Sequence, residues 1–151
     1  MSEVLERLYS PMIREHANQP RNRGRLRGAN RRASARNPLC GDCVSVYLRV
    51  DDGVIQEAAF ESFGCALCRA SASLLTEAVR GSHVELVVRL AVAVERMLTD
   101  RESGDQELLG DDLIGLACVR GFPSRVNCVL LPWWAALEAL GQPQATGQPG
   151  R

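Results

Sequence analysis

The chain contains no lysine: all 18 of its basic residues are arginine, and they balance 18 acidic residues. Without a lysine amine, the protein cannot form a Schiff base with a carbonyl substrate, so that class of catalysis is excluded. The formal net charge of zero also gives no indication of binding to nucleic acid or to an anionic membrane.

Long hydrophobic runs are missing as well. No stretch reaches the roughly 18 apolar residues of a membrane-spanning helix, and the charged N-terminus MSEVLERLYS lacks the apolar centre of a secretory signal. We therefore expect a cytoplasmic protein, in which paired cysteines bind metal or do redox chemistry more often than they form structural disulfides. The 151 residues suffice for one domain, which we assign to residues 1–141, followed by a disordered tail over 142–151.

The cysteines are the most informative residues that are present. The two C-x-x-C pairs and one isolated late cysteine are Cys40–Cys43, Cys65–Cys68 and Cys128. By spacing alone, the two pairs indicate a four-thiolate zinc site. The local sequence favours another grouping, because Asp42 follows Cys40 by two residues and Cys65 begins an expected helix. The competing site has three cysteines and one aspartate: Cys40, Asp42, Cys65 and Cys128.

Hydrophobic patterning predicts an antiparallel hairpin followed by helices. Alternating apolar residues indicate a strand over 40–50, Asp51-Asp52-Gly53 is a hairpin turn signal, and residues 54–63 read as the returning strand. Residues 18–36, which include seven arginines, are expected to be a solvated segment with one irregular strand. Helices are predicted over 11–17, 65–80, 82–98 and 107–119. The Gly121-Phe122-Pro123 sequence breaks the fourth helix, and a last helix is predicted to end at residue 140. Pro132 is expected to kink this last helix or to start it. The expected fold class is α+β, a small three-stranded antiparallel sheet packed on one face by about five helices.

This topology places the candidate ligands together at one end of the sheet. An antiparallel hairpin brings Cys40, at the start of one strand, close to Cys65, just past the end of the next. On an extended strand Cys40 and Asp42 project to one face and Cys43 to the other. Cys65 at a helix N-terminus has its thiolate favoured by the helix dipole.

The aspartate has a chemical consequence. A carboxylate is a harder and more labile ligand than a thiolate, so three thiolates and one carboxylate form a site that can open. A structural zinc site is closed by four firm ligands. The mixed set therefore favours a site that takes up sulfur or hands over a cluster. A structural zinc ribbon of the two C-x-x-C pairs stays the competing interpretation, although it leaves Cys128 unexplained.

At these residues the chain resembles the U-type iron–sulfur cluster assembly proteins, the IscU/SufU family, up to about residue 140. Four segments carry the resemblance: Glu15-His16 with Gln19-Pro20-Arg21-Asn22-Arg23-Gly24, Asn37-Pro38-Leu39-Cys40-Gly41-Asp42, Gly64-Cys65 with Ala70-Ser71-Ala72-Ser73, and Phe122-Pro123-Ser124-Arg125-Val126-Asn127-Cys128. Three features place the chain nearest the SufU branch. Asn127 stands where the scaffold branch has a histidine. The 62 residues between Cys65 and Cys128 fit the inserted form of the family, with residues 99–118 as the expected SufU-type insertion. Arg125 precedes the last cysteine by three residues, as a basic residue does in the SufU branch.

The resemblance implies a zinc-dependent sulfurtransferase. Cys40, Asp42, Cys65 and Cys128 would bind Zn²⁺, with Arg125 stabilising the thiolates. Cys40 would leave the metal, accept persulfide sulfur from a SufS-type, pyridoxal-phosphate-dependent cysteine desulfurase, and pass it to a downstream iron–sulfur assembly scaffold. The alternative is a non-enzymatic scaffold on which a [2Fe–2S] cluster is assembled on the same cysteines. Cys43 and Cys68 depart from the family pattern, so their roles stay open.

Overall fold

A three-stranded antiparallel sheet forms one layer of the molecule. The computed structural model describes residues 9–99 and 105–141, so the expected tail and part of the expected insertion lie outside the described residues. Strands β1 (Arg31–Arg36), β2 (Cys43–Asp51) and β3 (Val54–Phe63) follow one another in the order β1-β2-β3. The predicted hairpin turn is confirmed, because Asp52 and Gly53 have φ of 51° and 75°, the paired positive values that a tight turn between twisted strands requires.

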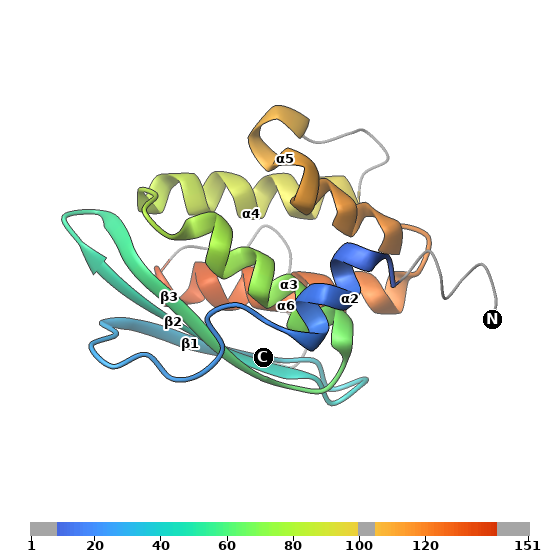
Figure 1. The fold of residues 1–151 in the computed structure, drawn as a ribbon, viewed down its shortest axis with the longest axis horizontal. Coiled ribbons are helices and arrows are strands. Elements are labelled where there is room, and N and C mark those ends of the chain that lie inside the picture. Colours follow the sequence, from blue (N-terminus) through green and yellow to red (C-terminus); the bar gives the residue numbers. More distant parts are fainter. Residues whose placement is uncertain (1–8, 100–104, 142–151) are drawn as a thin grey trace.

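Helices cover one face of this sheet in two further layers. They are α2 (Pro11–Asn18), α3 (Ala66–Val79), α4 (Val84–Thr99), α5 (Gln106–Ile114), the 3₁₀ segment η1 (Gly115–Val119) and α6 (Pro123–Ala139). Helix α3 packs on β3 and α6 on β1 and β2, while α4 packs on α6 and α5 packs on α4 (Figure 1). The α+β class with five α-helices in the described residues is therefore confirmed.

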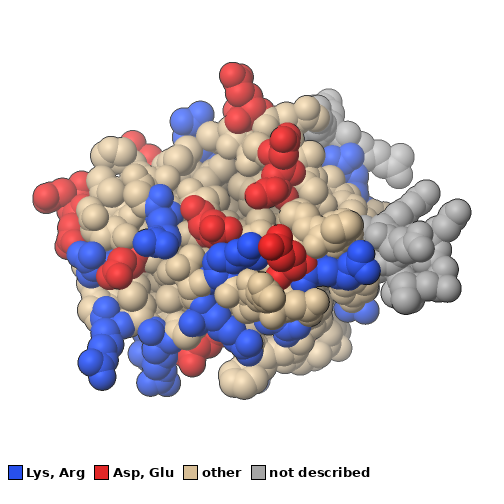
Figure 2. Space-filling view, viewed as in Figure 1, with Lys and Arg blue, Asp and Glu red and all other residues tan. Residues whose placement is uncertain are grey.

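The sheet face toward the helices supplies much of the core. Val44, Val46 and Leu48 alternate along β2 and are at most 2% exposed, as the sequence pattern predicts. Helix α6 packs on β1 and β2. Its Trp133 and Trp134 are almost fully buried and donate hydrogen bonds to Ser71 of α3 and Glu95 of α4. On the opposite side, arginine side chains gather along the lower part of the face in Figure 2, over the strands and the segment before them. Within the described residues, no helix combines the length and apolarity that crossing a bilayer requires.

Two expected elements differ in the structure. The helix expected over 107–119 is broken at Gly110, whose φ of 75° and ψ of 171° are not helical, and it ends as the 3₁₀ segment. Pro132 does not start a helix: α6 begins at Pro123 and runs through Pro132. A proline inside a helix removes a backbone hydrogen bond. The side chains around Pro132 are all buried, so their packing outweighs that loss.

Candidate metal centre

The predicted ligands lie at one end of the sheet, where three segments meet. Cys40 and Asp42 belong to the loop between β1 and β2, Cys65 is the N-cap residue of α3, and Cys128 lies in the second turn of α6. The register of the sheet explains the meeting, because Cys43 at the start of β2 pairs with Phe63 at the end of β3. Both flanking loops are thereby held side by side, as the hairpin argument predicts.

Three of these side chains form a compact group. Ligand atoms of Cys40, Asp42 and Cys128 all lie within 4.8 Å of one another, and the Cys40 and Cys128 sulfurs are 4.0 Å apart. In the described part of the chain, this is the one such group of three or more cysteine, histidine or acidic residues. Cys40 is exposed, whereas Asp42 and Cys128 are 2% and 1% exposed. The group therefore has two buried members and one that solvent reaches.

Asp42 carries a buried carboxylate that is only half satisfied. Its Oδ1 accepts a hydrogen bond from the backbone N–H of Cys65 at 2.8 Å, at the N-terminal end of α3 where the helix dipole favours negative charge. Its Oδ2 is buried and has no hydrogen-bond partner. An unpartnered oxygen of a buried carboxylate is costly, and it belongs to the group that includes the Cys40 and Cys128 sulfurs. This is the arrangement that a cation would complete.

Asn37 holds the loop that carries Cys40. Its backbone N–H donates to Asp42 O at 2.8 Å, its carbonyl accepts from Gly41 N at 2.8 Å, and its side-chain Oδ1 accepts from Leu39 N at 3.0 Å. Asn37 is 2% exposed. The sequence motif contains this residue, but no function was assigned to it; an asparagine before a proline is a common signal of such a side-chain-stabilised turn.

Gly64 makes room for the Asp42 carboxylate. It has a φ of +121°, and a Cβ at this position would lie 2.0 Å from Asp42 Oδ1. Any other residue would therefore clash with the carboxylate and also adopt a backbone conformation that side chains disfavour. The glycine before the second cysteine is thus required by the geometry of the aspartate.

Cys65, at the start of α3, is the one predicted ligand that is not a member of the compact group. Interaction with the Cys128 thiol lowers the pKa of Cys65 to about 7, and the first backbone N–H groups of α3 act in the same direction against the effect of burial. The Cys128 S–H itself donates to Ser124 O at 3.6 Å. Interaction with Cys65, burial and the neighbouring Asp42 raise the pKa of Cys128. The predicted thiolate character of Cys65 is confirmed in direction, with the neighbouring thiol as the larger cause.

Arg125 lies next to this pair, as the sequence analysis expects. Burial opposes its charge, but the nearby sulfurs of Cys65 and Cys128 outweigh that effect and raise its pKa. The guanidinium is therefore a fixed positive charge. Its charge lies beside the sulfurs of Cys65 and Cys128.

The remaining cysteines lie outside the compact group. Cys68 is 1% exposed, and burial raises its pKa well above the ordinary value, which describes an inert core thiol. Cys43 starts β2 between the buried Asp42 and Val44, on the opposite face of the strand. Burial also raises the pKa of Cys118. Within the described residues, the four thiols of the two C-x-x-C pairs do not form one compact group.

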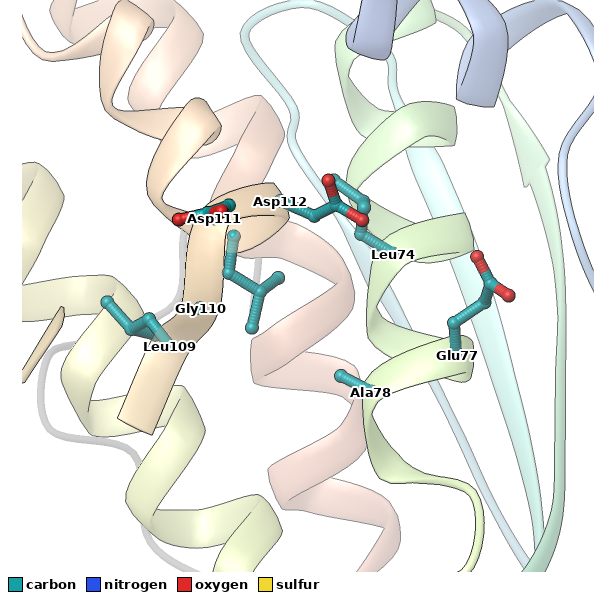
Figure 3. Close-up of a pocket in the computed structure, with 8 residues that line it drawn as sticks. Leu74, Glu77, Ala78, Leu109, Gly110, Asp111 and Asp112 are labelled. Carbon is teal, nitrogen blue, oxygen red and sulfur yellow. The ribbon is translucent and has the colours of Figure 1, made fainter. Parts of the chain in front are cut away.

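A separate hollow lies between α3 and α5 and contains no cysteine. This pocket of about 530 Å³ has an apolar floor and three acidic residues at its edge, Glu77, Asp111 and Asp112. In Figure 3, Asp112 faces Leu74 of α3, whereas Asp111 points to the other side of α5. None of its lining residues is a predicted ligand, so it is distinct from the metal centre.

Comparison with known proteins gives a consistent result. The family model described as the NifU-like N terminal domain matches residues 8–129. The chain is 35% identical over 137 residues to the iron–sulfur cluster assembly scaffold protein IscU of Thermotoga maritima, covering 91% of this chain and 95% of that protein. It is 34% identical over 131 residues to the zinc-dependent sulfurtransferase SufU of Bacillus subtilis, covering 87% and 88%.

Solved structures share the fold at similar coverage. A putative iron–sulfur cluster assembly scaffold protein for the SUF system from Fervidobacterium islandicum superposes with a TM-score of 0.84 at 29% identity, covering 89% of this chain and 98% of that one. The N-terminal part of a NifU-like protein from Brucella abortus gives a TM-score of 0.83 at 28% identity, covering 93% and 96%. Relatives named as scaffolds and as a sulfurtransferase are thus about equally similar, so the distinction depends on the residues of the centre.

Proposed function

The chain belongs to the NifU-like N-terminal domain family, which includes the iron–sulfur cluster assembly proteins IscU and SufU, and from this premise we propose that it is a zinc-dependent sulfur acceptor. The observation that supports this most strongly is the Asp42 carboxylate. It is buried beside two thiols, one oxygen is fixed by Cys65 N–H, and the other has no partner.

The donor set fits a zinc ion. Cys40, Asp42, Cys65 and Cys128 offer three sulfurs and one oxygen, a complement that zinc accepts in proteins. When bound, the metal would keep the thiols deprotonated at neutral pH and fix the loops that carry them. Metal binding would displace the protons of the thiols that become ligands.

Cys40 is the residue that we expect to receive sulfur. It is the exposed member of the compact group, so a partner can reach its thiol, whereas Cys128 is enclosed. The Cys40 thiolate attacks the outer sulfur of a persulfide on the partner cysteine. A new S–S bond forms on Cys40 while the partner's S–S bond breaks, and the electron pair leaves with the partner thiolate. The proposed partner is a SufS-type, pyridoxal-phosphate-dependent cysteine desulfurase, and the sulfur would continue to a downstream assembly scaffold.

The other side chains support this reaction by position and charge. Asp42 supplies the weakest of the four donors, because a carboxylate binds zinc more labilely than a thiolate does. Arg125 offsets the negative charge of the sulfurs. Gly64 lets the Asp42 carboxylate lie against the start of α3.

The domain organisation follows the same proposal. We assign residues 1–141 to one assembly domain and residues 99–118 to an insertion within it. The described part of that insertion is α5 and most of η1, and α5 packs on α4, remote from the sheet. In this proposal the insertion supplies no ligand, and the metal centre is formed by the end of the sheet together with α3 and α6.

The alternative is a scaffold that assembles a [2Fe–2S] cluster on the same cysteines. Relatives carry that name, and thiolates also bind iron–sulfur clusters. The residue before the third cysteine is Asn127, which offers an amide where the scaffold branch has an imidazole. That substitution favours the sulfur acceptor.

A single-turnover transfer experiment tests the proposal. The zinc-loaded protein is mixed with a cysteine desulfurase and L-cysteine, and the persulfide is located by alkylation and mass spectrometry. We expect one added sulfur on the peptide that contains Cys40, loss of that label in Cys40→Ser, and its retention in Cys43→Ser. Labelling that persists in Cys40→Ser would contradict the assignment of Cys40.

A further inference from the structure

A buried hydroxyl joins the two helices that carry Cys65 and Cys128. Ser71 of α3 is fully buried, and its Oγ donates a hydrogen bond to the Val129 carbonyl of α6 at 2.6 Å. The same Oγ accepts from the indole Nε1 of Trp133 at 3.1 Å. Val129 directly follows Cys128, so this contact lies one residue from a candidate ligand.

The two bonds fix how α6 lies on α3. Val129 and Trp133 are four residues apart, about one helical turn, and both bond to a single atom of α3. A serine inside a helix commonly bonds a carbonyl of its own preceding turn, whereas Ser71 donates its proton to the other helix. Two contacts one turn apart restrict both the sliding and the rotation of α6 against α3.

Apolar packing alone would define this arrangement less closely. Both helices bury mainly apolar side chains, and hydrophobic contacts have no preferred direction. A hydrogen bond depends on angle as well as distance, whereas its net contribution to stability is small. The two bonds of Ser71 therefore contribute position more than stability.

A proline interrupts the backbone bonding of α6 directly after the turn that carries Cys128. In a regular helix, the N–H of residue 132 would donate to the carbonyl of residue 128. Residue 132 is Pro132, which has no N–H. The backbone of Cys128 thus lacks this link to the following turn, and Ser71 holds the next carbonyl along from outside the helix.

We propose that Ser71 and Trp133 are positioning residues of the metal centre, which hold Cys128 in place against the ligands on the sheet and on α3. This inference rests on the proposed function where it takes zinc as the ion. Neither residue is a predicted ligand. Because Cys128 is held before the ion arrives, metal binding does not have to order this turn of α6.

Four substitutions of buried residues test this inference. Ser71→Ala and Trp133→Phe each remove hydrogen bonding between α3 and α6 with little change in shape. The matched controls remove the same kinds of bond from the same two helices. They are Ser73→Ala, whose hydroxyl bonds α2 and the segment after it, and Trp134→Phe, whose indole donates to α4.

Two measurements are made on each variant. Zinc affinity is measured by competition with a chromophoric chelator, and alkylation of Cys128 by iodoacetamide is followed in the metal-free chain by mass spectrometry. We expect Ser71→Ala and Trp133→Phe to bind zinc roughly ten-fold more weakly and to be alkylated faster at Cys128. Their losses should not add in the double variant, because both bonds belong to one contact. The controls should match wild type in both measurements, although urea unfolds them as easily as the first two variants.

The outcomes separate this inference from the proposed function. If wild type binds no zinc, the proposed function fails, and the alkylation of Cys128 still tests the positioning. Wild-type zinc affinity and alkylation rate in Ser71→Ala and Trp133→Phe would overturn the inference alone. Equal changes in the controls would overturn it too, because any loosening of the core would then weaken the centre.

Discussion

Asp42 is the residue on which the chemical character of the centre depends. A thiolate at this position would make a firm four-sulfur site, whereas a carboxylate gives one weak and exchangeable ligand. The structure adds that one of its oxygens is committed to the start of α3 and the other is free and buried. Asp42 therefore joins the local fold to metal binding through two different atoms.

The substitution Asp42→Asn separates these two functions. The new amide keeps an oxygen that accepts from Cys65 N–H, but it lacks the negative charge and the second oxygen. We expect the loop to stay folded and the zinc affinity to fall by at least the roughly 10–100-fold known for losing an outer-shell partner. Competition with a chromophoric chelator measures the affinity, and Asp52→Asn at the hairpin turn is the control. Equal affinities in both variants would show that Asp42 is not a ligand.

At the scale of single residues, the sequence predicted the candidate ligands but not their contacts. The spacing of Cys40 and Asp42 on an extended segment placed them on one face, and the structure shows them in one group. The unpartnered oxygen of Asp42 was not predictable, because it depends on where α3 begins relative to the loop. The same holds for the effect of Cys128 on the pKa of Cys65, because the two residues belong to helices far apart in the chain.

At the scale of elements, the junction between β3 and α3 is the part that shapes the centre. Gly64→Ala adds a Cβ that overlaps Asp42 Oδ1, at a φ of +121°. Gly24→Ala is a matched control, because Gly24 has a φ of +125° and open space around its Cβ position. We expect both variants to lose roughly 1–3 kcal/mol of stability from backbone strain. Only Gly64→Ala should also lose zinc, as measured by metal content after gel filtration.

A second element contact, between α2 and α3, makes stability depend on pH. His16 is 4% exposed, and its Nδ1 lies 2.8 Å from Ser73 Oγ. That hydroxyl also accepts from Arg21 N at 2.8 Å, so we assign its own proton to the bond with Nδ1. The other charged groups that act on the imidazole are Glu77, Asp112 and Glu15.

Burial, assisted by the charge of Arg21, lowers the pKa of His16 below its ordinary 6.5. As pH falls through 6.5, the unfolded chain binds this proton before the folded one does, so stability is complete above that pH and decreases below it. We expect His16→Asn, which keeps an acceptor near Ser73, to flatten the pH dependence of urea unfolding. His83→Asn should leave it as in wild type. Identical slopes in wild type and His16→Asn would contradict this account.

The sequence predicts helices and strands correctly where a local pattern of residues determines them. It fails where packing between distant segments determines the conformation. The hairpin and the buried alternation of β2 followed from turn residues and periodicity. Gly110 was not recognised as a break inside a helical pattern, since a glycine is compatible with either outcome. A helix start at Pro132 is wrong, because α6 begins at Pro123 and continues through this buried position.

At the scale of the whole molecule, the candidate centre connects segments that are distant in sequence. Its members come from the loop after β1, the start of α3 and the second turn of α6, so a bound ion would link the sheet to both helices that cover it. The exposed side of the centre is the side of Cys40, whereas Asp42 and Cys128 are buried. A partner can therefore reach the site at Cys40, while the buried Asp42 and Cys128 hold it to the core.

The proposed function requires that these residues hold zinc and receive sulfur, and that they do not store a cluster. The most direct test is the metal and acid-labile sulfide content of protein purified without oxygen. We predict a single zinc ion per chain, no sulfide and no visible absorbance. Iron with an equal amount of sulfide and a brown colour would contradict the claim and identify the protein as a cluster scaffold.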